Sequence, residues 1–167
     1  MGEIISNFFL EIVGKELCVF FCSMLPIIEL RGAIPMAFAF GLPCWEAYII
    51  SIFGNLLPVP FILLLINIVL KWMSNSKVKF FNKIANFLYK KVEKNRAKIE
   101  KYSFWGLCLF IAIPLPVTGA WTGSLVAAVI GMKPWKAFVS ALLGVLIAGV
   151  IVTLIVYGGI GFLAWLV

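Results

Sequence analysis

Two ionisable residues stand inside an apolar stretch at residues 25–35, which reads LPIIELRGAIP. Glu29 and Arg31 are two residues apart, with Pro26 and Pro35 on either side. A charge inside a membrane segment costs about 2.5 to 3.5 kcal/mol on insertion scales, so such a residue indicates a functional site. Residues two apart do not face each other on a continuous helix. Pairing therefore needs an interrupted backbone, which the prolines favour because a residue before proline is biased away from the helical conformation.

The chemistry of this stretch has two interpretations. In the first, Glu29 and Arg31 neutralise each other and fix the tip of a hairpin. In the second, they form a substrate or proton site, in which Arg31 binds an anion and Glu29 carries a proton because desolvation favours the protonated form of a carboxyl group. Pro35 suits the first position of a half-helix whose free N–H groups point toward the break, with Gly32 before it.

A second broken stretch at residues 114–124 reads PLPVTGAWTGS. Thr118 is predicted to cap a half-helix that begins near Gly119, and glycine lets a ligand approach the backbone closely. Two helix N-termini near mid-depth, together with Arg31, suit a phosphate or another anion. The hydroxyl groups here either bind the ligand or only pack between helices. The candidate binding residues are Arg31, Gly32, Pro35, Thr118, Gly119, Thr122, Gly123 and Ser124, with Glu29 as the proton carrier.

The composition indicates a membrane protein. Hydrophobic residues make up 63% of the 167 residues and charged residues 13%, whereas a soluble domain is about half apolar and about a quarter charged. Residues 48–70 and 137–167 contain no charge, and each run exceeds the roughly 20 residues needed to cross the hydrocarbon core. The chain has no histidine and four cysteines without a metal-binding arrangement, so we expect neither a metal nor a cofactor.

The basic residues gather in one segment. Residues 71–101 hold ten lysines and arginines and two glutamates. Between membrane segments, such a block indicates a cytoplasmic location rather than nucleic-acid binding. Its apolar residues recur at helical spacing, which predicts a cytoplasmic helix resting on anionic headgroups. Residues 1–16 have the pattern of an amphipathic helix that lies in the membrane interface.

The two apolar halves align with each other at an offset of 90 residues. Each half has a broken apolar stretch, a short corner with tryptophan, and a long apolar run. Ten helical residues rise about 15 Å, half the hydrocarbon core, so the broken stretches at residues 17–40 and 104–130 are predicted to enter and leave on the same side. The aligned pairs include Cys18 with Cys108, Pro26 with Pro116, Gly41 with Gly131, Trp45 with Trp135, and Gly54 with Gly144.

The charges at the corners predict that the repeats are inverted. Lys133 and Lys136 stay cytoplasmic only if residues 104–130 form a re-entrant hairpin, and Glu46 at the matching corner suits the outer side. The predicted fold is an all-α inverted repeat in one membrane domain, and inverted repeats are typical of secondary transporters. Its parts are an interfacial helix (1–16), repeat 1 (17–70), a basic cytoplasmic helix (71–101), repeat 2 (102–157) and a C-terminal tail (158–167).

ELRGAIP at residues 29–35 and PLPVTGAWTGS at residues 114–124 resemble the putative small multidrug export protein family, thought to be a distant branch of the DedA/VTT superfamily. The resemblance implies two re-entrant hairpins in inverted repeats, a prokaryotic inner membrane, and transport. In the DedA branch the implied cargo includes polyprenyl-phosphate lipid carriers, with proton or sodium coupling. Glu29 and Arg31 match the first motif of that branch, whereas residues 114–130 lack the arginines of its second motif.

The sequence therefore predicts a small multi-pass transporter or lipid flippase that moves an anionic or amphipathic cargo, with Glu29 as proton carrier. The alternatives are a small multidrug exporter of the same fold and a non-transporting membrane scaffold. An enzyme is not expected, because the chain lacks histidine, paired catalytic carboxylates and a nucleophile with a base. The expected partners are membrane lipids and the cargo, and a homodimer is one way for so short a chain to enclose a pathway. Nucleic acid is not expected.

Cysteine accessibility tests the inverted topology. In a chain whose native cysteines are replaced, Glu46→Cys and Lys136→Cys are expected to react with a membrane-impermeant thiol reagent from opposite sides of the membrane, because one corner is outer and the other cytoplasmic. The measurement is labelling in sealed vesicles of known orientation, before and after permeabilisation. Labelling of both positions from the same side contradicts the inverted repeat.

Overall fold

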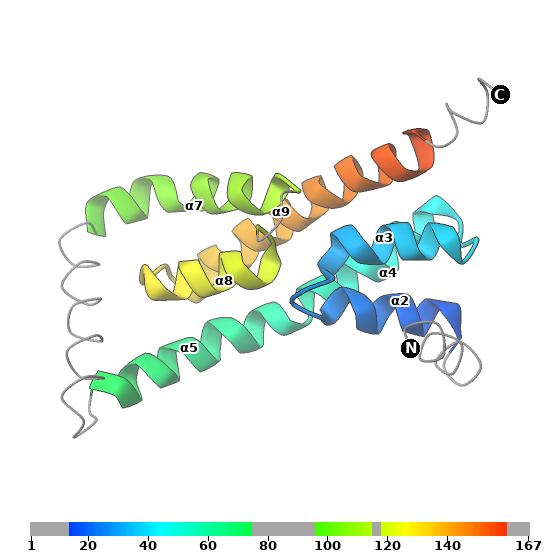
Figure 1. Cartoon of the computed structure of the whole chain (residues 1–167). Coiled ribbons are helices and arrows are strands. Elements are labelled where there is room, and N and C mark those ends of the chain that lie inside the picture. Colours follow the sequence, from blue (N-terminus) through cyan, green and yellow to red (C-terminus); the bar gives the residue numbers. More distant parts are fainter. Residues whose placement is uncertain (1–13, 75–95, 115–117, 160–167) are drawn as a thin grey trace. The chain divides into compact units, whose positions relative to one another are not determined.

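The computed structural model describes residues 14–74, 96–114 and 118–159, and these contain helices but no strand. The all-α prediction is therefore confirmed for this part of the chain. Most of the predicted interfacial helix, basic helix and C-terminal tail lies outside the described residues. The helices are α2 (Lys15–Met24), α3 (Glu29–Ala39), α4 (Cys44–Leu56), α5 (Pro58–Ser74), α7 (Arg96–Ala112), α8 (Ala120–Val129) and α9 (Pro134–Thr153), followed by the π-helical turn η1 (Leu154–Gly158) (Figure 1).

The chain forms two compact units. Unit 1 contains residues 1–57 and 145–167, and unit 2 contains residues 58–144. Unit 1 thus holds α2, α3, α4, the C-terminal half of α9 and η1, whereas unit 2 holds α5, α7, α8 and the N-terminal half of α9. The two units are described separately below.

In unit 1, α2 and α3 form an antiparallel hairpin (Figure 1). The turn occupies residues 25–28, and the amide of Glu29 donates to the carbonyl of Leu25 at 2.9 Å. At the other end of the hairpin, Lys15 Nζ donates to the carbonyl of Phe40 at 2.8 Å. A cation at this place also stabilises the negative end of the α3 dipole. The start of α2 and the end of α3 therefore lie together.

Helix α4 packs on both arms of this hairpin. Gly54 makes the approach to α2 possible, because a Cβ there would collide with Ser23 Oγ and lie 2.5 Å from the carbonyl oxygen of Phe20. Two tyrosines then fasten the end of α9 and η1 to this bundle. Tyr48 Oη donates to the carbonyl of Leu146 at 3.2 Å, and Tyr157 Oη donates to that of Leu42 at 2.8 Å.

Small residues also bring the helices of unit 2 together. A Cβ on Gly123 of α8 would lie 2.6 Å from the side chain of Ile111 on α7. A Cβ on Gly144 of α9 would lie 2.7 Å from the same side chain and 2.8 Å from the carbonyl oxygen of Cys108. Ile111 of α7 is therefore held between α8 and α9. Helices α7 and α8 form the hairpin of unit 2, and α5 packs on its second arm, α8.

The corners after α3 and α8 have the same backbone geometry 90 residues apart. Gly41 and Gly131 have φ angles of 76° and 73°, in the left-handed region that glycine enters without strain. The amide of Gly41 donates to Phe38 and that of the next residue to Ala37, and Gly131 and its successor repeat these bonds at Ala128 and Ala127. This is the Schellman motif, which ends a helix by satisfying its last carbonyl groups.

Two stretches are long and apolar enough to cross a membrane, Cys44–Ile66 and Pro134–Gly158. They overlap the two charge-free runs from which crossings are predicted, and each begins a few residues earlier than its run. The first is divided at Leu57, where α4 ends and α5 begins with Pro58. Leu57 keeps helical dihedral angles of −56° and −44°, so the division there comes from the hydrogen bonds that Pro58 and Pro60 cannot make.

Residues 96–101, the last residues of the predicted basic helix, are helical and continuous with residues 102–112 in α7. They contain no helix breaker, and lysine, arginine, glutamate and alanine are strong helix formers. Where the basic helix ends and the second repeat begins stays a prediction.

A matched pair of glycine substitutions tests the helix approach in unit 1. Gly54→Ala is expected to lower the free energy of unfolding by about 1–3 kcal/mol, since the added methyl group overpacks the contact between α4 and α2. Gly106→Ala on α7 is the control: among the described residues, nothing lies within 4 Å of the position that its Cβ would take, and alanine raises helix propensity. Thermal unfolding in detergent measures both. Equal stability of the two variants contradicts the close approach at Gly54.

Candidate functional site

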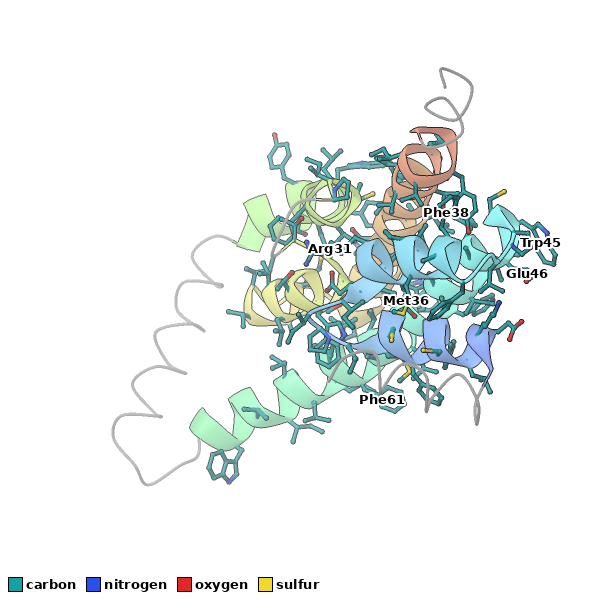
Figure 2. All side chains as sticks on the ribbon, turned by 45° about the vertical axis from the view of Figure 1, so that its right-hand side comes forward. Arg31, Met36, Phe38, Trp45, Glu46 and Phe61 are labelled. Atoms are coloured by element: carbon teal, nitrogen blue, oxygen red, sulfur yellow. The ribbon has the colours of Figure 1, made fainter. Side chains whose placement is uncertain are left out.

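Glu29 and Arg31 form an ion pair at the start of α3. Arg31 Nη2 lies 3.7 Å from Glu29 Oε2, and the side chains are 24% and 4% exposed, respectively. The pairing that the sequence left open therefore exists. Figure 2 shows Arg31 near the beginning of α3, close to the hairpin turn. A pair this poorly hydrated neutralises charges that would each be costly alone in an apolar segment.

The backbone of Glu29 explains how residues two apart come within reach. Glu29 is the first residue of α3 and has φ of +50°, the only positive φ of a non-glycine residue in the described part of the chain. In this left-handed conformation its side chain leaves the direction it would have on a regular helix. Such a conformation costs an L-residue about 1–2 kcal/mol. Strained residues of this kind concentrate at functional sites, where surrounding structure holds them in place.

The prediction that Pro35 begins a half-helix is wrong. We expected it to begin a half-helix, but α3 begins six residues earlier and Pro35 is an internal residue. The turn at residues 25–28 already breaks the chain, and the φ of proline is compatible with the helix that follows. Because Pro35 has no N–H, α3 lacks the regular helical bond from residue 35 to the carbonyl of Arg31. Pro35 therefore changes the backbone hydrogen bonding at the residue that carries the guanidinium.

Gly32 follows the ion pair and lies against the turn. Its amide donates to the carbonyl of Ile28 at 3.1 Å, and a Cβ on Gly32 would lie 2.6 Å from Ile28 Cγ2. The missing side chain thus makes room for a residue of the same hairpin. Its predicted role in binding cargo stays a prediction.

The second predicted set lies at the start of α8, in unit 2. The helix begins at Ala120, close to the predicted start, but its cap residue is Gly119 and no side chain caps it. Thr118 instead donates its hydroxyl to the carbonyl of Ile113 at 2.8 Å. The expectation that Thr118 caps α8 is therefore wrong, because this hydroxyl reaches back to the end of α7 and closes the tip.

The remaining residues of this set bond to or pack on their own hairpin. Ser124 Oγ donates to the carbonyl of Ala120 at 2.6 Å, and Thr122 Oγ1 approaches that of Gly119 at 3.4 Å. The space beside Gly123 is taken by Ile111. These contacts correspond to the helix-packing role that was one of the two interpretations of the hydroxyl groups.

Sequence reasoning did not select three buried polar groups in unit 1. Ser51 Oγ and Asn55 Oδ1 on α4, and Thr153 Oγ1 at the end of α9, are buried without a hydrogen-bond partner among the described residues. The available signal was the spacing of Ser51 and Asn55, four residues apart within a span that has no charge. Among the residues that the structure describes, no cluster of histidine, cysteine, aspartate or glutamate is able to hold a metal ion.

A family model described as "Putative small multi-drug export protein" matches residues 29–151, which is most of the chain. The chain belongs to this family. The predicted resemblance to the small multidrug export family is thus confirmed, while the link to the DedA/VTT superfamily stays a prediction. No curated protein and no solved structure matches the chain. With two membrane-capable helices, this small multidrug export family member is a membrane protein.

Substitution of Glu29 by glycine or alanine tests the strained backbone. Both changes remove the carboxylate, but only glycine tolerates φ of +50°. Glu29→Gly is therefore expected to be more stable than Glu29→Ala by about 1 kcal/mol, measured by thermal unfolding. Glu16 on α2 provides the control, since in a regular helix the order reverses and alanine is more stable by a similar amount. The same order at both positions contradicts the left-handed backbone at Glu29.

Proposed function

We propose that this family member is a secondary transporter whose cargo is an amphipathic molecule with an anionic group, bound at the Glu29–Arg31 pair. The observation that carries the proposal is the ion pair itself, at 3.7 Å with the carboxylate side chain 4% exposed. Ionisable residues inside membrane segments are rare and mark substrate and ion pathways. The family description, small multidrug export, supports a small molecule as the cargo.

The pair is chemically suited to exchange. Its N–O separation exceeds the range of a good hydrogen bond, and the guanidinium of Arg31 has five donors that match carboxylate and phosphate oxygens. An anionic cargo competes with Glu29 for this cation. Once Arg31 turns to the cargo, the buried carboxylate becomes costly in its charged form and takes up a proton. Cargo and proton therefore bind together, which is the coupling we propose for Glu29.

Re-entrant hairpins and an inverted repeat belong to the same proposal. The open ends of the first hairpin lie together at Lys15 and Phe40, and its arms have 10 and 11 residues. At about 1.5 Å per residue, each arm reaches roughly half the hydrocarbon core. The matching corners at Gly41 and Gly131 support the duplication. We propose a prokaryotic inner-membrane location with residues 71–101 in the cytoplasm.

Transport by purified protein in proteoliposomes tests the proposal. An amphipathic fluorescent anion is the first probe, and a short-chain fluorescent prenyl phosphate is the second, because a drug-like anion and a phosphate lipid share the same chemistry at Arg31. Glu29→Gln and Arg31→Ala are each expected to reduce transport at least tenfold, since either change removes one partner of the exchange. A pH-sensitive dye inside the vesicles measures the proton that moves with the cargo.

The control is Glu16→Gln, the same chemical change at an exposed carboxylate of α2, which is expected to transport normally. Thermal unfolding of each variant separates loss of transport from loss of fold. Transport of the prenyl phosphate alone identifies a lipid carrier as the cargo. Normal transport by both folded variants removes the Glu29–Arg31 site from the pathway, and no transport of any probe by the unmodified protein favours the scaffold alternative.

A further inference from the structure

Two polar side chains on one face of α4 are buried without partners in the described part of the protein. Ser51 and Asn55 are four residues apart, so both lie on the same side of the helix, and they are 0% and 3% exposed. Neither Ser51 Oγ nor Asn55 Oδ1 has a hydrogen-bond partner there. An unsatisfied polar group in an apolar environment costs about 1–3 kcal/mol by mutational estimates. Helix α4 lies within the membrane-capable stretch Cys44–Ile66, where lipid supplies no partner.

The other buried serines show that this chain normally satisfies its hydroxyl groups. Ser23 donates to the carbonyl of Phe20 at 2.7 Å, Ser124 to that of Ala120 at 2.6 Å, and Ser140 to that of Phe104 at 2.6 Å. A serine in a membrane helix usually bonds back to a carbonyl three or four residues earlier, as Ser23 and Ser124 do. Ser51 does not. Its hydroxyl, like the side-chain oxygen Oδ1 of Asn55, is therefore able to bond to a group outside the helix.

Backbone oxygens that lack their regular helical bond lie beside Asn55 in the sequence. Pro58 and Pro60 have no N–H, so the carbonyls of Gly54 and Leu56 cannot receive the usual bond from four residues on. The amide just before Pro58, that of Leu57, already donates to Phe53 at 3.1 Å. The end of α4 therefore carries side-chain and backbone oxygens in excess of donors over about two turns.

We propose that Ser51 and Asn55 bind water and form part of a hydrated track along α4. The ligand must donate hydrogen bonds to carbonyl oxygens and accept or donate at a hydroxyl, and water does both with two to four partners. A metal or ammonium ion suits these oxygens less well, because α4 has no charged residue after Glu46 to balance a cation. The proposal depends on α4 spanning the membrane and does not depend on the cargo site.

A water track gives the crossing a function that packing alone does not. Non-helical or unsatisfied backbone at membrane depth is tolerated where it lines a water-filled cavity. The two prolines leave the carbonyl oxygens of Gly54 and Leu56 without their helical bond, and the two polar side chains add their own oxygens. Water is then able to donate hydrogen bonds to all of them.

Cysteine reactivity tests the track in sealed vesicles. In a chain without native cysteines, Ser51→Cys and Asn55→Cys are treated with a small methanethiosulfonate. The cysteine thiolate attacks this reagent, so the reaction needs a hydrated thiol that can ionise. Ala37→Cys on α3 is the matched control, because Ala37 is 0% exposed and packs in the apolar core cluster of unit 1. We expect both test thiols to react at least tenfold faster than the control thiol. Test thiols as unreactive as the control, or all three equally reactive, overturn the proposal.

Substitution by apolar side chains provides a second measurement. If the site were dry, Asn55→Leu would remove an unpaired group and raise the unfolding temperature. If water satisfies Asn55, the same change is expected to leave stability unchanged or lower it. Thr153→Val is the comparison, since Thr153 is also buried without a partner among the described residues but lies apart from α4 in the sequence. A clear rise in stability for Asn55→Leu counts against bound water.

Discussion

The hairpin of unit 1 depends on one constraint: a charge placed in apolar surroundings must be neutralised nearby. Glu29 is almost completely buried, and its partner Arg31 lies 3.7 Å away on the same turn of chain. To bring them together the backbone takes a left-handed conformation at Glu29, which is costly for a residue with a side chain. The cost of leaving a buried carboxylate unpaired is larger, so the strained conformation persists.

Close helix packing keeps this arrangement in place. Gly54 and Gly144 let α4 and α9 lie directly on the backbone of a hairpin arm. Two other glycines, Gly41 and Gly131, end α3 and α8 in the left-handed conformation. Tyr48 of α4 donates to the carbonyl of Leu146 on α9, and Tyr157 of η1 donates to that of Leu42. In a membrane, where lipid tails and leucine are equally apolar, such close contacts and buried hydrogen bonds replace the hydrophobic effect as the force between helices.

The buried polar groups within this packing divide into two classes. Most buried hydroxyl groups bond to a carbonyl of their own hairpin or a neighbouring helix, and they stabilise packing. The Glu29–Arg31 pair, Ser51 and Asn55 do not fit that role, since each either stores strain or leaves an oxygen without a partner among the described residues.

The sequence by itself determined the features that depend on local chemistry. Charge-free runs predicted two membrane-capable helices, proline at residue 26 predicted the turn, and Gly41 and Gly131 predicted matching corners, since each follows from residue type over a few positions. It did not determine the role of Pro35, Thr118 or Ser51. Proline is compatible with both the start and the interior of a helix, and a hydroxyl bonds to whichever carbonyl lies nearest. The contact between Glu29 and Arg31, and the burial of Ser51 and Asn55, were decided only by tertiary structure, because a backbone angle and the packing of neighbouring helices fix which oxygens find a partner.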